Sequence, residues 1–225
     1  MQKKIAVIND LSGYGRCSLT VAIPVLSAMG HQCCPVPTAI LSSHTEFPVY
    51  FFDDYTEKMT PYTDKWKELG LSFDAIATGF LGSEAQIEIV MDIIQKLDAE
   101  KTFVVVDPVM GDHGHAYETY TPEMCEQMKE LVCMADVVLP NVTECCILTD
   151  TPYREENWTR KELLNMAMML RLMGAKSGVI TGVREGSYYT NVVLEQGQYD
   201  AKFIRTKSSG GERPGTGDVF SSVVA

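Results

Sequence analysis

The sequence lacks long apolar runs and an excess of positive charge. Its N-terminal stretch MQKKIAVIND contains one apolar run of four residues, which is too short for a signal-peptide core or a membrane span. We therefore expect a cytoplasmic protein with no membrane partner. The net charge of −11 leaves no basic face to bind nucleic acid. A phosphorylated ligand remains compatible with this charge, because backbone N–H groups can hold phosphate.

Cysteine motifs typical of disulfide frameworks or zinc sites are also missing. The chain has seven cysteines, an odd count, with two adjacent pairs and no CxxC spacing. This pattern supports neither a disulfide framework nor a zinc site. We expect buried, reduced thiols. The sequence also has no internal repeat, low-complexity tract or obvious linker, and its 225 residues are enough for one sizeable core, so we expect a single domain over residues 1–225.

Short apolar strands alternate with amphipathic helical patterns along the chain. The expected strands cover residues 5–8, 32–41, 73–78, 102–107, 136–141 and 177–181. The expected helices cover residues 18–30, 83–97, 121–135 and 159–174, and residues 187–204 read as a hairpin that turns near Gly197. Such alternation predicts an α/β fold with a central, mainly parallel sheet covered by helices on both faces.

Ligands of parallel sheets bind beyond the carboxyl ends of the strands. Polar or small residues follow five of the expected strands, from five separate segments. They are Asn9-Asp10, Thr78-Gly79-Phe80, Asp107, Asn141 and Thr181-Gly182. Any one of them could simply terminate a strand, but together they indicate a ligand site.

Two stretches resemble familiar sites incompletely. GYGRCS nearly spells the dinucleotide fingerprint, but Ser18 replaces the third glycine and no acidic residue ends the second extended stretch. A glycine turn that leads into a helix is the better interpretation, with Asp10 and Ser12 available to a ligand. DPVMGDHGH offers two aspartates and two histidines, for which a solvated loop is preferred over a metal cage. Asp107 directly follows three valines and could hold a cation or water near phosphates.

The stretches PNVTE and PGTGD carry the strongest local signals. Asn141 and Glu144 have the spacing of a capping box, and Glu144 could alternatively hold Mg²⁺ beside a nucleotide. In PGTGD, two glycines flank Thr216 directly before an apolar helix, so that backbone N–H groups can form an anion hole. Asp218 follows in the first helical turn, where it could take a proton from a hydroxyl that attacks a phosphate.

An N-terminal glycine-rich turn, SSHT, DPVMGD, PNVTE and GTGD occur in this order along the chain. Together they resemble the ribokinase-like superfamily and, within it, the pyridoxal/pyridoxamine kinase family. The resemblance runs from Lys4 to Ala225. DPVMGD and GTGD are also shared with hydroxymethylpyrimidine kinases, whereas LSSHTEF and the GYG turn are more typical of pyridoxal kinases.

The resemblance implies a role for each matching position. Asp218 would be the general base, and Gly215, Thr216 and Gly217 would offer N–H groups to the transferring phosphoryl group. The implied metal and nucleotide residues are Asp107, Asn141, Glu144 and Thr181, with Mg²⁺ held by Asp107 and Glu144. The implied substrate residues are Asp10, Ser12, His44, Thr45 and Phe80. Asp10 stands where the family often has serine, and its carboxylate could pair with a protonated pyridine nitrogen or with an amine.

The implied activity is ATP-dependent phosphorylation of the 5′-hydroxyl of pyridoxal, pyridoxine or pyridoxamine. Mg²⁺ is the expected cofactor, a monovalent cation is a further candidate, and a homodimer is expected by analogy. Two alternatives stay open: a hydroxymethylpyrimidine kinase of the same fold, and a non-catalytic nucleotide- or vitamin-binding protein. The family normally continues for several tens of residues beyond the GTGD helix, so we expect the 225 residues to be a kinase domain that is incomplete at its C-terminus.

Overall fold

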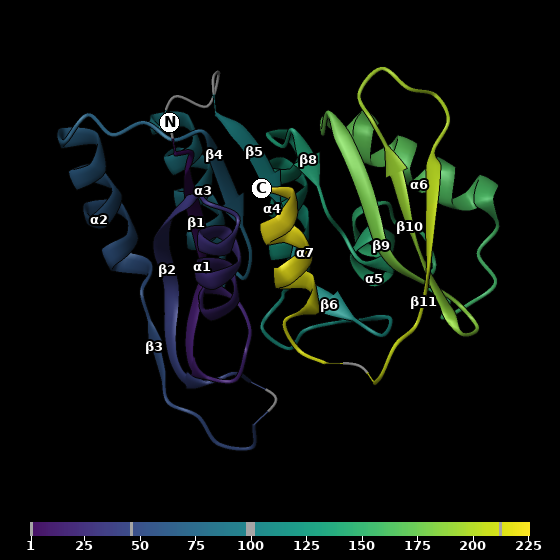
Figure 1. Cartoon of the computed structure of the whole chain (residues 1–225), viewed down its shortest axis with the longest axis horizontal. Helices are drawn as coiled ribbons and strands as arrows, with labels where there is room; N and C mark the ends of the chain where they lie inside the picture. The colour runs from purple at the N-terminus through teal and green to yellow at the C-terminus, as the bar shows by residue number, and fades with distance from the viewer. Residues whose placement is uncertain (1, 46, 98–101, 212) are drawn as a thin grey trace. The chain divides into compact units, whose positions relative to one another are not determined.

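The computed structural model describes residues 2–45, 47–97, 102–211 and 213–225. The chain divides into two compact units: Met1–Val105 together with Glu212–Ala225, and Val106–Gly211. Each unit combines strands with covering helices, as the alternating pattern predicts (Figure 1). The α/β class with a mainly parallel arrangement is therefore confirmed.

The strands of the first unit are ordered β5-β4-β1-β2-β3. Their bounds are β1 Lys4–Tyr14, β2 Gln32–Ser43, β3 Phe52–Asp54, β4 Ala75–Thr78 and β5 Phe103–Val106. β1 pairs in parallel with β2 and β4, and β3 is antiparallel to β2. The central position of β1 explains its apolar run, because Ile5, Ala6, Val7 and Ile8 are all buried.

Among the described residues, four helices belong to the first unit. They are α1 Leu19–Ala28, α2 Thr56–Glu68, α3 Glu84–Lys96 and α7 Thr216–Val224. α1 packs on β1 and β2, α2 packs on β2 and α3, and the C-terminal α7 lies beside α1 although almost 200 residues separate them (Figure 1). This contact places the GTGD loop next to Arg16 and Cys17, two of the residues that join β1 to α1.

The second unit contains strands in the order β8-β9-β10-β11, namely Val137–Val138, Ser177–Glu185, Tyr188–Leu194 and Lys202–Lys207. β8 and β9 are parallel, while β9, β10 and β11 form an antiparallel meander. A small hairpin joins β6 Gly111–Asp112 to β7 His115–Ala116. The helices are α4 Pro122–Cys133, α5 Val142–Leu148 and α6 Arg160–Met173. α6 packs on β9 and β10, and α5 packs on β9.

Side-chain hydroxyls cap the starts of three helices. Ser83, Thr121 and Thr159 each accept a hydrogen bond at the start of α3, α4 and α6, and α4 has its proline in the first turn. The hairpin between β10 and β11 turns at Gly197, whose φ is 77°. None of the helices in the described ranges has the length and apolar character needed to span a bilayer.

Two expectations need correction. β1 continues through Gly13 and Tyr14, where a turn was predicted, because Leu11, Ser12 and Tyr14 keep pairing with β2. β2 lies between β1 and β3, and its prolines, Pro35 and Pro37, precede Ala39–Leu41, the part that β3 covers. All seven cysteines are free, but only Cys145 and Cys146 are buried and Cys133 is exposed. α2 and β3 were not predicted.

Candidate functional site

The GTGD loop leads directly into α7. Gly215 is the N-cap residue and has φ 80°, a left-handed conformation that glycine adopts without strain. A Cβ atom at this position would also clash with the carbonyl oxygen of Arg16. The loop can therefore approach the start of α1 closely only because residue 215 is glycine. Helix starts leave N–H groups unsatisfied and favour anions, as the anion-hole interpretation requires.

Asp218 lies half-buried in the first turn of α7. Its Oδ1 accepts a hydrogen bond from Nδ2 of Asn9 at 3.3 Å, and the backbone N–H of Ser18 also donates to the carboxylate. Burial raises the pKa of Asp218, the Ser18 and Asn9 bonds lower it, and the charge of Asp10 raises it; the net direction is upward. A carboxylate with a raised pKa is a better proton acceptor than an ordinary aspartate.

Asp10 is buried and fully engaged by neighbouring hydroxyls. Its Oδ2 accepts from the hydroxyl of Ser12 at 2.8 Å, and its Oδ1 accepts a short hydrogen bond from the hydroxyl of Ser18. Burial raises the pKa of Asp10, while both serines and the nearby His44 lower it. Asp10 thus joins β1 to the start of α1, a role that the sequence did not indicate, and it brings Ser12 and His44 into one group.

The Gly13–Gly15 stretch at the end of β1 and the SSHT stretch meet at His44. Gly15 has φ 99°, and a Cβ atom there would overlap the imidazole ring of His44. The His44 and Phe47 rings pack in a tilted arrangement with centroids 4.6 Å apart, and the centroids of Phe47 and Tyr14 are 5.3 Å apart. Thr45 is exposed beside this aromatic group, while Glu46 of the same stretch lies outside the described residues.

Phe80 follows β4 and is fixed through its backbone. Its N–H donates to Oδ1 of Asn9 at 2.9 Å, and its carbonyl oxygen accepts from the hydroxyl of Thr38 at 2.9 Å. The residue is half-buried. The first unit therefore brings together Asp10, Ser12 and Asp218 through direct bonds or charges, and it links Phe80 to the same group through Asn9.

In the second unit, Asn141 and Glu144 form the predicted capping box of α5. Asn141 Oδ1 accepts from the Glu144 N–H at 2.9 Å, and Glu144 Oε2 accepts from the Asn141 N–H at 2.8 Å. Glu144 Oε1 also accepts from the N–H of Met110 at 3.2 Å, and Asn141 donates to the carbonyl of Gly111 at 2.8 Å. Both residues are thus tied to the loop after β5.

Glu144 and Asp107 place two carboxylates near one another. Glu144 is almost completely buried, which raises its pKa well above the usual range, and the charge of Asp107 raises it further. The buried hydroxyl of Tyr120 has no hydrogen-bond partner among the described residues, and its pKa is raised by burial and by the Glu144 charge. A cation would offset this negative charge, so the residues present fit a metal ion.

The donor set fits Mg²⁺ shared with phosphate better than a cage made by protein alone. Among the residues that the structure describes, no group of three or more His, Cys, Asp or Glu side chains is arranged to hold a metal. Mg²⁺ usually takes one or two carboxylates and completes its shell with water and substrate phosphates. The histidines of DPVMGDHGH lie in the β6–β7 hairpin, where His113 and His115 are exposed.

Thr181 lies in β9 and forms a parallel bridge with Asn141. Its N–H donates to the carbonyl of Pro140 at 2.9 Å. Thr181 and the Asn141–Glu144 capping box therefore share one stretch of the second unit. The sequence placed Asn9 at a strand end but gave no role for it, and it indicated no role for Ser18 or Tyr120. Asn9 bonds to a residue far away along the chain, Ser18 bonds to Asp10 only because the folded backbone brings the two side chains together, and Tyr120 is noticeable only because its buried hydroxyl has no hydrogen-bond partner among the described residues.

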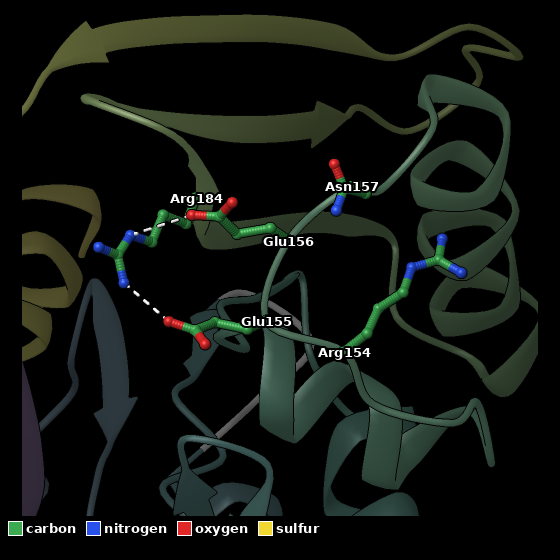
Figure 2. Close-up of a pocket in the computed structure, with 5 residues that line it drawn as sticks. All are labelled: Arg154, Glu155, Glu156, Asn157 and Arg184. Atoms are coloured by element: carbon green, nitrogen blue, oxygen red, sulfur yellow. Dashed lines mark hydrogen bonds and ion pairs between the residues drawn. The ribbon is translucent and has the colours of Figure 1, made fainter.

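A separate pocket of about 630 Å³ opens elsewhere on the second unit, and its lining residues are Arg154, Glu155, Glu156, Asn157 and Arg184 (Figure 2). Figure 2 shows Arg184 directed toward both glutamates, at 2.8 and 3.5 Å. Arg154 pairs with Glu162 outside this group. The arginines are therefore neutralised within the chain, and the pocket contains none of the predicted site residues.

Comparisons with known proteins agree with this arrangement. The sequence pattern of the phosphomethylpyrimidine kinase family matches residues 22–225. A Bacteroides thetaiotaomicron protein assigned as a phosphomethylpyrimidine kinase, solved with pyridoxal, is 41% identical, with a TM-score of 0.94 over 100% of this chain and 79% of that chain. Pyridoxal kinase from Lactobacillus plantarum is 29% identical, with a TM-score of 0.89 over 100% and 80% of the two chains. Pyridoxal kinase from Dictyostelium discoideum is 25% identical over 100% of this chain and 78% of its own length.

Proposed function

Because the chain belongs to the phosphomethylpyrimidine kinase family, we propose that it transfers the γ-phosphoryl group of ATP to the 5′-hydroxyl of a B6 vitamer: pyridoxal, pyridoxine or pyridoxamine. The observation that carries the proposal is the position of Asp218, a carboxylate with a raised pKa directly behind the glycine loop that opens α7. The 41% identical relative solved with pyridoxal and the pyridoxal kinases of similar fold support this choice of substrate.

The base and the anion hole come from one turn of chain. Asp218 accepts the proton of the attacking hydroxyl, and the raised pKa improves its match to neutral pH. Backbone N–H groups of Gly215, Thr216 and Gly217 stabilise the charge that develops on the transferring phosphoryl group. Phosphoryl transfer needs mainly such positioning and charge stabilisation.

The nucleotide and metal residues are assigned to the second unit. Asp107 and Glu144 would hold Mg²⁺, whose positive charge balances that of the phosphate oxygens. Asn141 and Thr181 would lie by the nucleotide, and a monovalent cation is a further candidate cofactor. The buried carboxylate of Glu144 and the unpartnered hydroxyl of Tyr120 support a charged ligand at this position.

The vitamer residues are assigned to the first unit. His44 and Thr45 would contact the substituents of the pyridine ring, and Phe80 would stack on the ring. Ser12 and Asp10 would lie near the ring nitrogen. The bond between Asp10 and the Ser12 hydroxyl supports a joint role for these two residues.

A substrate panel tests the proposal and its closest alternative. Purified protein is incubated with ATP, Mg²⁺ and each of pyridoxal, pyridoxine, pyridoxamine and hydroxymethylpyrimidine, and phosphorylated product is measured. We expect turnover of at least one B6 vitamer. Robust turnover of hydroxymethylpyrimidine alone would establish the alternative kinase, which the name of the matching family favours. Binding of vitamer and nucleotide without turnover would establish the non-catalytic alternative.

We further propose that residues 1–225 serve as one kinase domain that acts in the cytoplasm as a homodimer. The seven free cysteines support a reducing compartment. Light scattering during size-exclusion chromatography measures the mass in solution, and a monomer at micromolar concentration would contradict the dimer.

A further inference from the structure

Asn9 connects three segments of the first unit through one side-chain amide. It is buried in β1, after the apolar run, with 6% of its surface exposed. Its Oδ1 accepts from the N–H groups of Asp10 and Phe80, both at 2.9 Å, and its Nδ2 donates to Oδ1 of Asp218 at 3.3 Å. The amide thus contacts the strand, the loop after β4 and the first turn of α7.

The two backbone bonds determine which way the amide faces. An amide oxygen accepts hydrogen bonds, whereas the NH₂ group only donates them. If the amide of Asn9 were turned over, its NH₂ group would face the N–H groups of Asp10 and Phe80, which also donate. Two buried donors would then lose their partners, at a cost that keeps the observed orientation. The NH₂ group is therefore held toward Asp218 by contacts that do not involve Asp218.

The surroundings of Asn9 leave no room for another arrangement. A Cβ atom on Gly79 would overlap the Asn9 amide, so the loop after β4 approaches it only because residue 79 is glycine. The cavity that Asn9, Thr78 and Asp218 line has a volume of about 10 Å³. Such a space holds about one water and no vitamer. Asn9 is therefore linked to the proposed chemistry through its bond to Asp218.

From these contacts we propose that Asn9 is a positioning residue for the general base, whose amide N–H sets the rotation of the Asp218 carboxylate and stabilises its ionised form. The inference rests on the proposed role of Asp218 as the base. Burial is the main cause that raises the pKa of Asp218 and the Ser18 bond the main cause that lowers it; the charge of Asp10 raises it further and the Asn9 bond lowers it. A base must be ionised before it can accept a proton, so the Asn9 bond contributes to the pH at which the enzyme begins to work.

The substitution Asn9→Asp tests the donor to Asp218. Aspartate has the same shape and keeps an oxygen for the two backbone N–H groups, but it replaces the donor with a second negative oxygen beside Asp218. We expect kcat to fall about 10- to 100-fold and the acid limb of the kcat/KM profile to move up by about one pH unit. The KM for the vitamer should stay within about twofold, because Asn9 does not touch it.

A matched control separates local from general charge effects. Asn165 is exposed on α6, so Asn165→Asp adds the same charge away from Asp218 and should keep the parent profile. If Asn9→Asp does not fold, as judged by circular dichroism and melting, Asn9→Ala removes the donor to Asp218, together with the acceptor of the Asp10 and Phe80 N–H groups, without adding charge. It should lower kcat with little change in KM.

The outcomes distinguish this inference from the proposed function. A folded Asn9→Asp protein with an unmoved acid limb, alongside an inactive Asp218→Asn protein, overturns the positioning role and leaves the base in place. An active Asp218→Asn protein overturns the base itself. A moved acid limb in Asn9→Asp together with an unchanged profile in Asn165→Asp supports the inference.

Discussion

Asp218 and Glu144 are both carboxylates with raised pKa values, but the chain holds them by different means. Glu144 is fixed by residues close to it in sequence, chiefly through its capping box with Asn141. Asp218 is held by Asn9, which lies 209 residues away along the chain, and by the backbone N–H of Ser18, which is also distant in sequence. Glu144 is thus part of the local structure of α5, whereas the position of Asp218 depends on the packing of α7 beside α1.

Because of this difference, we expect substitutions at the two carboxylates to affect different properties of the protein. Both oxygens of Glu144 accept backbone N–H groups, so its removal leaves buried donors without partners. Asp218 is half-buried and is opposed by the charge of Asp10, so its ionised form is unfavourable in the folded state. We therefore expect substitutions at Asp218 to reduce activity and substitutions at Glu144 to reduce stability.

The largest expected effect is on catalysis by Asp218→Asn. Asparagine keeps the size of the side chain but cannot accept the proton, so kcat should fall about 10²- to 10⁴-fold. The melting temperature should stay equal or rise slightly, because a buried charge is removed. Steady-state assays and thermal melts measure the two quantities. A loss of both activity and folding would show that Asp218 also has a structural role and would blur the contrast with Glu144.

Glu144→Gln should give the opposite pattern. The glutamine NH₂ group would face one of the two backbone N–H donors, from Asn141 or Met110, and leave it unsatisfied. The free energy of unfolding should fall by about 1–3 kcal/mol, as measured by urea denaturation. The matched control is Glu162→Gln, since Glu162 is the equivalent residue of the exposed α6 capping box and should cost less. Equal losses at both positions would contradict the role of burial at Glu144.

How much of each site could be predicted follows from the same contrast. The capping box at Asn141 depends on residues three apart, so it could be predicted from the sequence; the box at Thr159 has the same spacing but was not predicted. The contact of Asn9 with Asp218 depends on the tertiary fold and could not be predicted from spacing. The serine partners of Asp10 were likewise missed, because Ser18 takes an unusual backbone conformation with φ 51° at the end of the GYG turn.

The elements that were not predicted, β3 and α2, also depend on tertiary contacts. The strands β1, β4 and β5 could be predicted from their apolar runs, because a strand that is buried on both faces consists mainly of apolar residues. β3 consists of exposed residues and is a strand only because it pairs with β2. α2 has only two buried residues, Met59 and Thr63, and contains a proline, so its apolar pattern is weak.

The pH dependence of stability should distinguish Asp218→Asn from its parent. A carboxyl group whose pKa is raised on folding binds its proton more tightly in the native state. Its contribution to stability is complete below the unfolded pKa, near 3.8, and is lost as the pH rises through the higher native value. The variant should therefore gain stability relative to the parent as the pH rises from about 4 to 7. Urea denaturation across this range measures the difference, and a constant difference would contradict the raised pKa.

The smallest expected effect concerns the choice of vitamer by Asp10. Asp10→Asn removes a charge that is already bonded to Ser12 and Ser18, so folding should change little while the charge available to a substrate amine is lost. We expect kcat/KM for pyridoxamine to fall several-fold more than that for pyridoxine, by about 1 kcal/mol or less in binding. Asp10 also raises the pKa of Asp218, so its removal should move the acid limb to lower pH, opposite to Asn9→Asp. Equal losses for both vitamers with a shifted limb would assign Asp10 to the base and not to the substrate.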